Sequence, residues 1–309
     1  MENRRVADLL ETDKTIFSFE FFPPKTAKGW SKLFQTIGTE LLPLRPAYVS
    51  VTYGAGGFTR ARTHELVTRI QEEFGLTVVA HLTCVGSSRD EIDAILDDYD
   101  RAGVHNVLAL RGDPPKDPDV LSTMEGRLGP DGHGSPDFPY ASALVEHIRR
   151  RYRHFSIGVA GFPEGHPATP NRLREIELLK QKIEAGADYI VTQLFFDNRD
   201  YFDFVERLRL SGIEVPVIAG IMPITGPRSM QRMAELAAGA RFPAALLRAT
   251  ARTRDEDGVR RVGVHWATAQ VADLLNAAVP GIHLYTLNNS RATIDICRNL
   301  GLDTYHLER

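Results

Sequence analysis

Two kinds of segment alternate along the chain. Short runs of apolar, β-branched and aromatic residues have the length of buried strands, and longer segments repeat apolar positions with the period of an amphipathic helix. The predicted strands are 16–22, 47–53, 77–83, 106–112, 156–162, 189–195, 216–222 and 281–287. The predicted helices between them include 63–74, 89–102, 140–151, 173–185 and 201–211.

The spacing of these segments predicts a (β/α)8 TIM barrel. The first four strands begin about 30 residues apart, which is the size of one βα unit, and eight such units fit a chain of 309 residues. We expect a single catalytic domain over residues 1–309, with two or three extra helices in 228–277 before the last strand. The alternative, an open doubly wound sheet, needs a GxGxxG turn after the first strand, and Pro23, Pro24 and Lys25 stand there instead.

Polar side chains gather where the predicted strands end. They are Glu20, Thr52, His81, Arg111, Asp113 and Gln193. Strand alternation places Glu20 in the lumen, opposite three phenylalanines, and barrel enzymes take their catalytic groups from these strand ends. The sequence therefore predicts an active site here, with Glu20 as a functional acid.

Structural interpretations of the same residues stay open. Glu20 on the outer face would pair with a lysine of a helix. His81 alone suits a hydrogen-bonded core residue, Arg111 and Asp113 suit a structural ion pair, and Gln193 suits a backbone cap. The segment 113–139 is rich in proline and glycine, which fits either a lid over the site or an inert surface loop.

Composition narrows the function classes. The chain has 37 Lys and Arg against 40 Asp and Glu, a net charge of −3, which argues against a nucleic-acid or polybasic membrane partner. No run approaches the roughly 20 apolar residues of a membrane span, and the first residues do not resemble a signal peptide. The two cysteines suit a reducing cytoplasm. No metal is expected, because His166 has no second ligand at metal spacing.

Taken together, the strand ends resemble the methylenetetrahydrofolate reductase family, in particular its bacterial-type catalytic domain. The matching segments are FSFEFFPPK at 17–25, VSVTYGA at 49–55, HLTC at 81–84, LRGDPP at 110–115, FPEGHP at 162–167, IVTQLFF at 190–196, GIMP at 220–223 and YTLN at 285–288. They follow the family's order and span nearly the whole chain. Each segment alone is weak evidence, and the set is specific.

The resemblance implies a flavoenzyme of one-carbon metabolism. Family members are (β/α)8 barrels that hold FAD across the carboxyl ends of the strands. NADH or NADPH reduces the flavin and leaves, and 5,10-methylenetetrahydrofolate then takes its place and is reduced to 5-methyltetrahydrofolate. The resemblance also implies a cytoplasmic homo-oligomer whose partners are small molecules. It does not indicate which nicotinamide is the donor.

The resemblance further implies roles for single residues. Glu20 matches the general acid that protonates a folate nitrogen, a task that an apolar pocket favours because it keeps a carboxyl group protonated. Asp113 matches an aspartate near pterin and flavin, and Gln193 matches a contact to substrate and nicotinamide. The matched cofactor contacts are Thr52, Tyr53, Ala55, His81, Arg111, Gly112, Asp113, Tyr140, Ala141, His166 and Lys182. Among them, Lys182 is expected to reach the FAD phosphates.

Four positions depart from the family pattern. Phe162 replaces a tyrosine of the FAD site, and Glu175 replaces an aspartate. Met233 falls where some members stack an aromatic ring on nicotinamide, and Asn289 falls where some place an arginine on folate. Two other hypotheses are kept: a different barrel flavin oxidoreductase, such as a proline-dehydrogenase-like enzyme, and a flavin-free folate-binding barrel.

Overall fold

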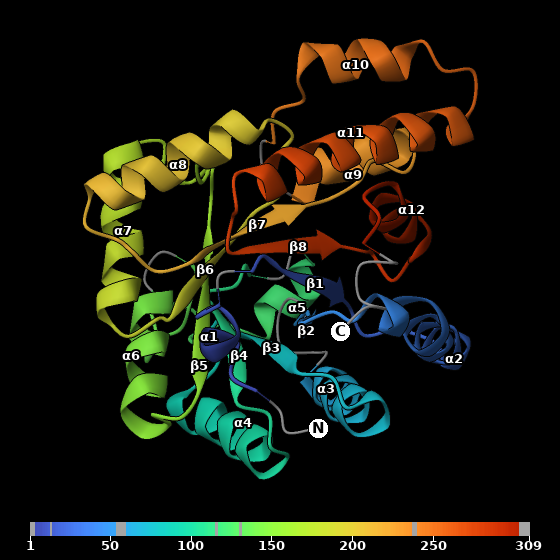
Figure 1. The fold of residues 1–309 in the computed structure, drawn as a ribbon. Coiled ribbons are helices and arrows are strands. Elements are labelled where there is room, and N and C mark those ends of the chain that lie inside the picture. Colours follow the sequence, from blue (N-terminus) through green and yellow to red (C-terminus); the bar gives the residue numbers. More distant parts are fainter. Residues whose placement is uncertain are drawn as a thin grey trace.

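The computed structural model describes residues 4–12, 14–53, 60–114, 117–129, 132–236 and 240–302. In it, eight parallel strands pair in sequence order and the last pairs with the first, which closes a barrel (Figure 1). The strands are β1 (Ile16–Phe21), β2 (Tyr48–Val51), β3 (Val78–Thr83), β4 (Asn106–Leu110), β5 (Ser156–Gly161), β6 (Tyr189–Thr192), β7 (Val217–Ile221) and β8 (Gly281–Tyr285). All eight predicted strands are confirmed, and most end one to three residues earlier than predicted.

Helices surround the barrel (Figure 1). They are α1 (Val6–Leu9), α2 (Ala27–Thr36), α3 (Arg60–Phe74), α4 (Arg89–Arg101), α5 (Pro118–Ser122), α6 (Ala141–Arg151), α7 (Arg172–Glu184), α8 (Asn198–Leu210), α9 (Pro227–Leu236), α10 (Ala244–Ala251), α11 (Glu256–Asn276) and α12 (Arg291–Asn299). A π-helical turn (Ile37–Leu41) and a 3₁₀ turn (Leu42–Leu44) extend α2. The predicted (β/α)8 barrel with extra helices before the last strand is confirmed.

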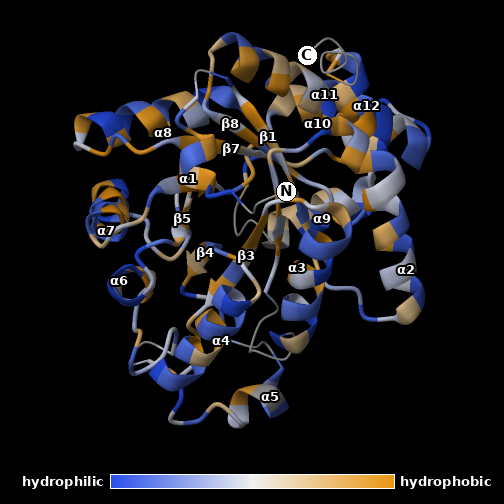
Figure 2. Cartoon of the chain, turned by 60° about the horizontal axis from the view of Figure 1, so that its bottom comes forward, coloured by the Kyte–Doolittle hydropathy of each residue, from blue (hydrophilic) through white to orange (hydrophobic). Residues whose placement is uncertain are grey.

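The alternation of side chains along each strand places them either in the core between the strands and the helices or in the lumen of the barrel. Phe19 and Phe21 of β1 lie in the main core between the strands and the helices, and both are almost fully buried. Ser18 and Glu20 point the other way, into the lumen. Figure 2 shows the central strands largely in apolar colours and the helices in both colours, as expected when each helix packs one face on the barrel.

A short helix closes the amino-terminal end of the barrel. Val6 and Leu10, from α1 and its end, pack against lumen residues of the strands. The backbone N–H of Val6 donates to Asn106 Oδ1 at 2.8 Å, and that of Ala7 donates to Ser156 Oγ at 3.0 Å. Because this end is filled, a cavity in the lumen opens toward the carboxyl ends of the strands. The sequence analysis did not predict α1.

The three extra helices follow β7. Figure 1 shows α10 outside α11, on the side away from the strands. A third apolar cluster, which includes Phe196, Met222, Ile224 and Leu246, packs this part of the chain onto the barrel. Met233 is 1% exposed within the same cluster. The Met233 side chain is therefore packed among apolar neighbours, and its correspondence to a nicotinamide-stacking position stays a prediction.

The described part of the segment 113–139 is tied to the β3–α4 connection. The backbone N–H of Gly86 donates to the carbonyl of Gly134 at 2.9 Å, and Arg127 Nε donates to the carbonyl of Gly86 at 2.9 Å. Arg127 also pairs with Glu91. These contacts favour the surface-loop interpretation of this part over a freely moving lid.

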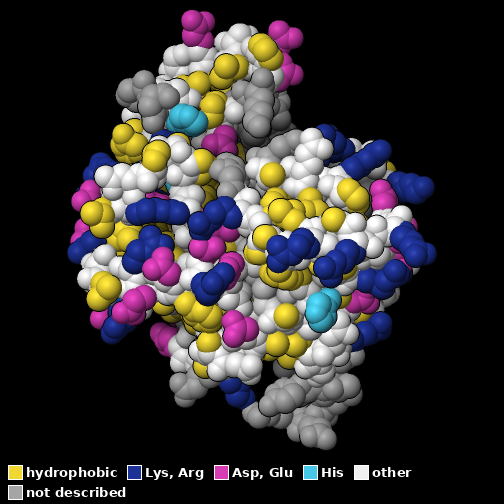
Figure 3. All heavy atoms as spheres, turned by 90° about the horizontal axis from the view of Figure 1, so that it is seen from above, with side chains coloured by type: hydrophobic (Ala, Val, Ile, Leu, Met, Phe, Trp, Pro, Cys, Tyr) yellow, Lys and Arg dark blue, Asp and Glu magenta, His cyan; other side chains and the backbone are white. Residues whose placement is uncertain are grey.

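Surface charge is mixed on the face drawn in Figure 3, where basic and acidic side chains are interspersed. The arginines at the end of α6 also have acidic partners, since Arg149 pairs with Asp188 and Arg151 with Asp93. None of the described helices is both long and apolar enough to cross a membrane.

Gly112 and Gly212 offer a matched test of the loop after β4. Both have left-handed backbones, with φ of +81° and +76°. A Cβ at Gly112 would lie 2.8 Å from Val85 Cγ1, whereas a Cβ at Gly212 would meet nothing within 4 Å. We expect Gly212→Ala to cost about 1–2 kcal/mol from backbone strain, and Gly112→Ala to cost about 2–4 kcal/mol because overpacking adds to that strain. Urea unfolding of both variants measures the difference, and equal costs would contradict the packing described here.

Candidate active site

Glu20 lies near the carboxyl end of β1, and its backbone is fixed by the neighbouring strand ends. Thr286 Oγ1, just after β8, donates to the carbonyl of Glu20 at 2.6 Å. The next residues are held in the same way, because the side-chain amide of Asn288 accepts from the N–H of Phe22 at 2.9 Å and donates to its carbonyl at 2.8 Å. The loop after β8 thus sets the position from which the Glu20 side chain enters the lumen.

The Glu20 carboxyl group faces two histidines. Its Oε2 lies 3.5 Å from Nε2 of His81 and 3.7 Å from Nε2 of His283, and the Glu20 side chain is 19% exposed. His283 is also held by two serines, with Nδ1 2.7 Å from Ser18 Oγ and Nε2 3.3 Å from Ser50 Oγ. Serines, a histidine and a carboxyl group from β1, β2 and β8 therefore form one buried polar array.

His81 is poised as a neutral imidazole. Burial lowers the pKa of His81; the Glu20 carboxylate acts against this shift, and His283 adds to it. Its Nε2 is buried and has no hydrogen-bond partner. A buried polar atom without a partner is costly in a protein interior, so this nitrogen is a natural contact for a ligand in the lumen.

A cavity of about 280 Å³ opens above this array. That volume lies near the lower end of the roughly 300–1,000 Å³ typical of small-molecule pockets. Its polar lining residues are Glu20, Tyr48, Ser50, His81, Tyr189, Gln193, His283 and Tyr285. Its apolar walls include Val79, Leu108, Leu110 and Phe162. A flat ring system can therefore pack on apolar walls while its polar atoms meet the lumen array.

A second group of side chains brings positive charge to the edge of the cavity. Lys182 Nζ donates to the carbonyl of Ala160, a lining residue, at 3.3 Å. Burial lowers the pKa of Lys182 to about 8, with Glu175 opposing and Arg111 adding to the shift. Burial also lowers the pKa of His166, with further lowering by Arg111 and Lys182. In the described part of the chain, no carboxylate lies within ion-pair distance of Lys182.

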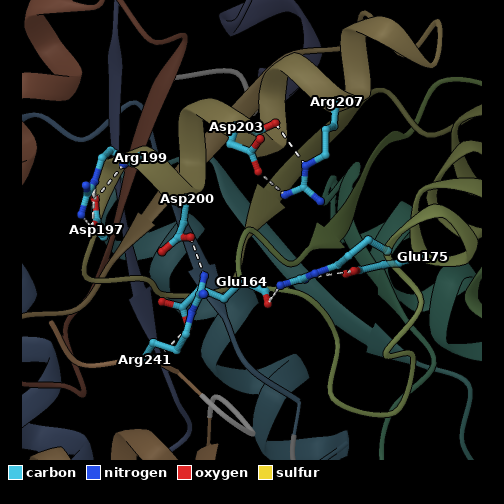
Figure 4. Close-up of polar contacts among 9 residues, drawn as sticks. Glu164, Glu175, Asp197, Arg199, Asp200, Asp203, Arg207 and Arg241 are labelled. Carbon is cyan, nitrogen blue, oxygen red and sulfur yellow. Dashed lines mark hydrogen bonds and ion pairs between the residues drawn. The ribbon is translucent and has the colours of Figure 1, made fainter.

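An ion-pair network supports the loop that carries His166 (Figure 4). Glu175 Oε1 accepts from the backbone N–H of His166 at 3.0 Å. Glu164 Oε2 accepts from the backbone N–H of Arg241 at 2.7 Å, and the Arg241 guanidinium pairs with Asp200. Burial is the main cause that raises the pKa of both Glu164 and Glu175. The β5–α7 loop is thereby fastened to α8 and to the segment before α10.

The structure brings four predicted site residues to the cavity wall: Glu20, His81, Phe162 and Gln193. Arg111, His166 and Lys182 form the charged edge, and Asp113 is exposed but close enough to influence the pKa of His166. Phe162 and His166 meet edge to face at 4.6 Å. The remaining predicted residues are farther from the wall or engaged elsewhere.

Those remaining residues have local roles or lie outside the described ranges. Thr52 donates its N–H to Phe21, and Tyr53 is half-buried outside the lining set. Tyr140 is exposed immediately before α6, where Ala141 is buried. Asn289 Oδ1 accepts from the N–H of Arg291, and the residue is exposed. Ala55 lies outside the described residues. Cofactor or substrate contacts by this group stay predictions.

Strand alternation along β1 is as expected. Phe19 and Phe21 face the helix layer, and the Glu20 side chain lines the cavity. The groups nearest its carboxyl are the imidazoles of His81 and His283. The charge of Glu20 also acts on Tyr48 and Tyr285, where it adds to the effect of burial and raises the pKa of each hydroxyl. Successive side chains of a strand point to opposite faces, so the residues directly before and after Glu20 point away from the lumen.

Sequence reasoning missed four polar residues of the lumen: Tyr48, Tyr189, His283 and Tyr285. His283 and Tyr285 stand in phase on the predicted strand 281–287, and Tyr48 stands in phase with Ser50 on the strand 47–53. Applying strand alternation to every predicted strand would have found them. Only the registers between strands place His283 beside Ser18, to which it is paired across β1 and β8.

Comparison with known proteins decides the family. The family model described as methylenetetrahydrofolate reductase matches residues 5–301. The chain belongs to the methylenetetrahydrofolate reductase family. It is 39% identical to methylenetetrahydrofolate reductase (NADH) 1 of Arabidopsis thaliana, over 96% of this chain and 50% of that protein. It is 35% identical to 5,10-methylenetetrahydrofolate reductase of Escherichia coli K12, over 92% of this chain and 90% of that protein.

The chain thus spans about half the length of its plant relatives. Among solved structures, a Clostridium thermocellum protein described as binding 5-methyl-5,6,7,8-tetrahydrofolic acid aligns with a TM-score of 0.63 at 12% identity, over 96% of this chain and 99% of that one. Oxaloacetate acetylhydrolase aligns with a TM-score of 0.52 at 12% identity, over 99% and 87%. At these identities the two structures support the barrel fold alone.

The candidate site fits the FAD that the family resemblance implies. The cavity offers apolar walls and the unpartnered Nε2 of His81 for a flat polar ring. At its edge, Lys182 is partly buried, and its only described hydrogen bond goes to a backbone carbonyl. Removing an ammonium group from water without a counter-ion is costly, and a phosphate group would relieve that cost.

The lowered pKa of Lys182 predicts how the stability of the FAD-free protein changes with pH. Its folded pKa of about 8 lies below the value near 10.4 of an unfolded lysine, so the unfolded chain binds more protons between these pH values and stability rises with pH there. Below pH 8 the charge is buried and destabilises the fold. We expect Lys182→Met to be more stable than wild type by roughly 1–3 kcal/mol at pH 7, and to lose the rise between pH 8 and 10.

Urea unfolding across this pH range measures both effects. Lys180→Met is the matched control, because Lys180 is exposed on the same helix, and we expect it to leave the pH profile unchanged. A Lys182→Met protein that is less stable than wild type at pH 7 and keeps the wild-type pH slope would contradict the burial of this charge.

Proposed function

We propose that this chain reduces 5,10-methylenetetrahydrofolate to 5-methyltetrahydrofolate, with NADH or NADPH as electron donor and FAD as bound cofactor. The observation that carries the proposal is the Glu20 carboxyl group, held inside the cavity between two imidazoles. The names of the relatives support the same reaction, and the plant relatives are named for NADH. The two substrates are proposed to use one cavity in turn, in a ping-pong sequence.

The proposed role of Glu20 is to donate a proton to the folate nitrogen that leaves the methylene bridge. Bound FAD supplies hydride transfer, which needs an electrophilic carbon, and that carbon forms when the protonated nitrogen departs. The carboxylate that remains lies 3.5 Å from Nε2 of His81 and 3.7 Å from Nε2 of His283, and the two imidazoles are proposed to stabilise its charge as polar neighbours. Ser18 and Ser50 hold the His283 ring in place for this role.

Other residues are proposed to bind and orient. Gln193, on the cavity wall, offers an amide that both donates and accepts hydrogen bonds to a pterin or a nicotinamide. Lys182, Arg111 and His166 are proposed to hold the FAD phosphates, and Phe162 to pack on the cofactor. Asp113, at the mouth, is proposed to hydrogen-bond the pterin. We further propose that the protein acts in the cytoplasm as a homo-oligomer.

Glu20→Gln separates the two half-reactions. Gln keeps the shape of Glu but cannot donate the proton, so we expect NAD(P)H to bleach bound flavin at a rate within about threefold of wild type. Reoxidation of reduced flavin by methylenetetrahydrofolate should fall by roughly 10²–10⁴-fold, which is the usual size of a general-acid effect. Anaerobic stopped-flow absorbance measures each half-reaction alone.

Glu214→Gln is the control for this experiment, because Glu214 is exposed in the connection before β7, at the opposite end of the barrel. It should leave both half-reactions unchanged. Equal losses in the two half-reactions of Glu20→Gln, or a folate half-reaction that stays near the wild-type rate, would overturn the assigned role of Glu20.

A further inference from the structure

Two histidines and a carboxylate meet at the amino-terminal end of the barrel, far along the strands from the cavity. Asp100 lies in the last turn of α4, His105 immediately precedes β4, and one residue, Phe155, separates His154 from β5. Asp100 Oδ1 lies 3.1 Å from His105 Nε2 and 2.7 Å from His154 Nε2. One ligand atom from each residue therefore falls within 4.8 Å of the other two.

The backbone around the three residues is fixed. The N–H of Ser156 donates to the carbonyl of His105 at 2.8 Å, which joins the entries of β4 and β5. Phe155 is fully buried and packs against both rings, at 5.5 Å from His105 and 5.0 Å from His154. The imidazoles are thus oriented by packing, and both Nε2 atoms lie beside the same carboxylate oxygen, Asp100 Oδ1.

The electrostatics of this position favour a cation. Asp100 places its negative charge beside the carbonyl end of α4, where the helix dipole is also negative. Two arginines of the flanking helices have other partners, since Arg101 pairs with Asp98 and Arg149 with Asp188; Arg153 directly precedes His154 in sequence. The cluster is partly open to water, with Asp100 39% and His154 50% exposed, so an ion can enter.

We propose that Asp100, His105 and His154 bind a divalent transition-metal ion of the zinc class. Two imidazoles and one carboxylate suit Zn²⁺, with water as the fourth ligand. Metal–ligand distances near 2.0–2.1 Å in a tetrahedron separate the ligand atoms by about 3.3 Å. The carboxylate–imidazole distances of 3.1 and 2.7 Å would lengthen to about that value, and the two Nε2 atoms already lie within 4.8 Å of each other. The bound ion ties the end of α4 to the entries of β4 and β5.

The sequence analysis expected no metal because it searched for ligands at short spacing. These ligands are dispersed, and only the pairing of β4 with β5 brings the two histidines together. The proposed site takes no part in the proposed reduction, so its test does not depend on that activity.

The test is a Zn²⁺ titration by isothermal calorimetry of the full chain, after removal of metals with a chelator and of the chelator by dialysis. We expect one Zn²⁺ per chain and a higher melting temperature with Zn²⁺. His105→Ala and His154→Ala should each weaken binding at least tenfold, and the double variant should lose both the binding and the rise in melting temperature. His265→Gln, which removes an exposed histidine of α11, is the matched control and should bind as wild type does.

Melting of the metal-free variants shows whether they fold, and substitutions at such partly exposed positions are expected to change stability little. If a histidine variant does not fold, Asp100→Asn replaces it in the titration. The proposal is overturned if wild type shows neither heat nor a melting shift with Zn²⁺, or if the Asp100, His105 and His154 variants bind Zn²⁺ as tightly as wild type.

Discussion

The Glu20 carboxyl group is held inside a barrel that is filled at one end and open at the other. Burying a carboxyl group is costly unless polar partners surround it, and here the partners come from β2, β3 and β8 as well as β1. They converge only because the barrel closes and sets the registers between these strands. The packing of α1 below and the tie from Thr286 above then leave one direction for a ligand to approach the acid.

Much of the fold could be predicted from the sequence because it rests on local rules. Strand length, helical period and the glycines after helices are short-range signals, and Gly75, Gly103, Gly186 and Gly212 all adopt the left-handed backbone expected of a C-terminal cap. The helix α1 escaped prediction because four residues carry too little periodicity. It forms because Asn106 and Ser156, far along the chain, satisfy its backbone.

The candidate site could be predicted in part. Strand ends pointed to Glu20, His81 and Gln193, because polar residues at one end of apolar strands stand out in a sequence. His283 did not stand out, because its place in the site depends on its pairing with Ser18 between β1 and β8, where the barrel closes. Asp100, His105 and His154 were missed for the same reason. The two proposals also place different roles at the two ends of the barrel, with the proposed reduction at the carboxyl ends of the strands and the proposed metal site at the amino-terminal ends.

The absorbance spectrum of the purified protein, recorded without oxygen before and after addition of NADH or NADPH, tests the central claim most directly. The proposal that the cavity holds an isoalloxazine ring against the Glu20 array predicts the two visible bands of a bound flavin, bleached by a nicotinamide and restored by methylenetetrahydrofolate. Colourless protein that takes up no added FAD, or bound flavin that no nicotinamide reduces, would contradict the account.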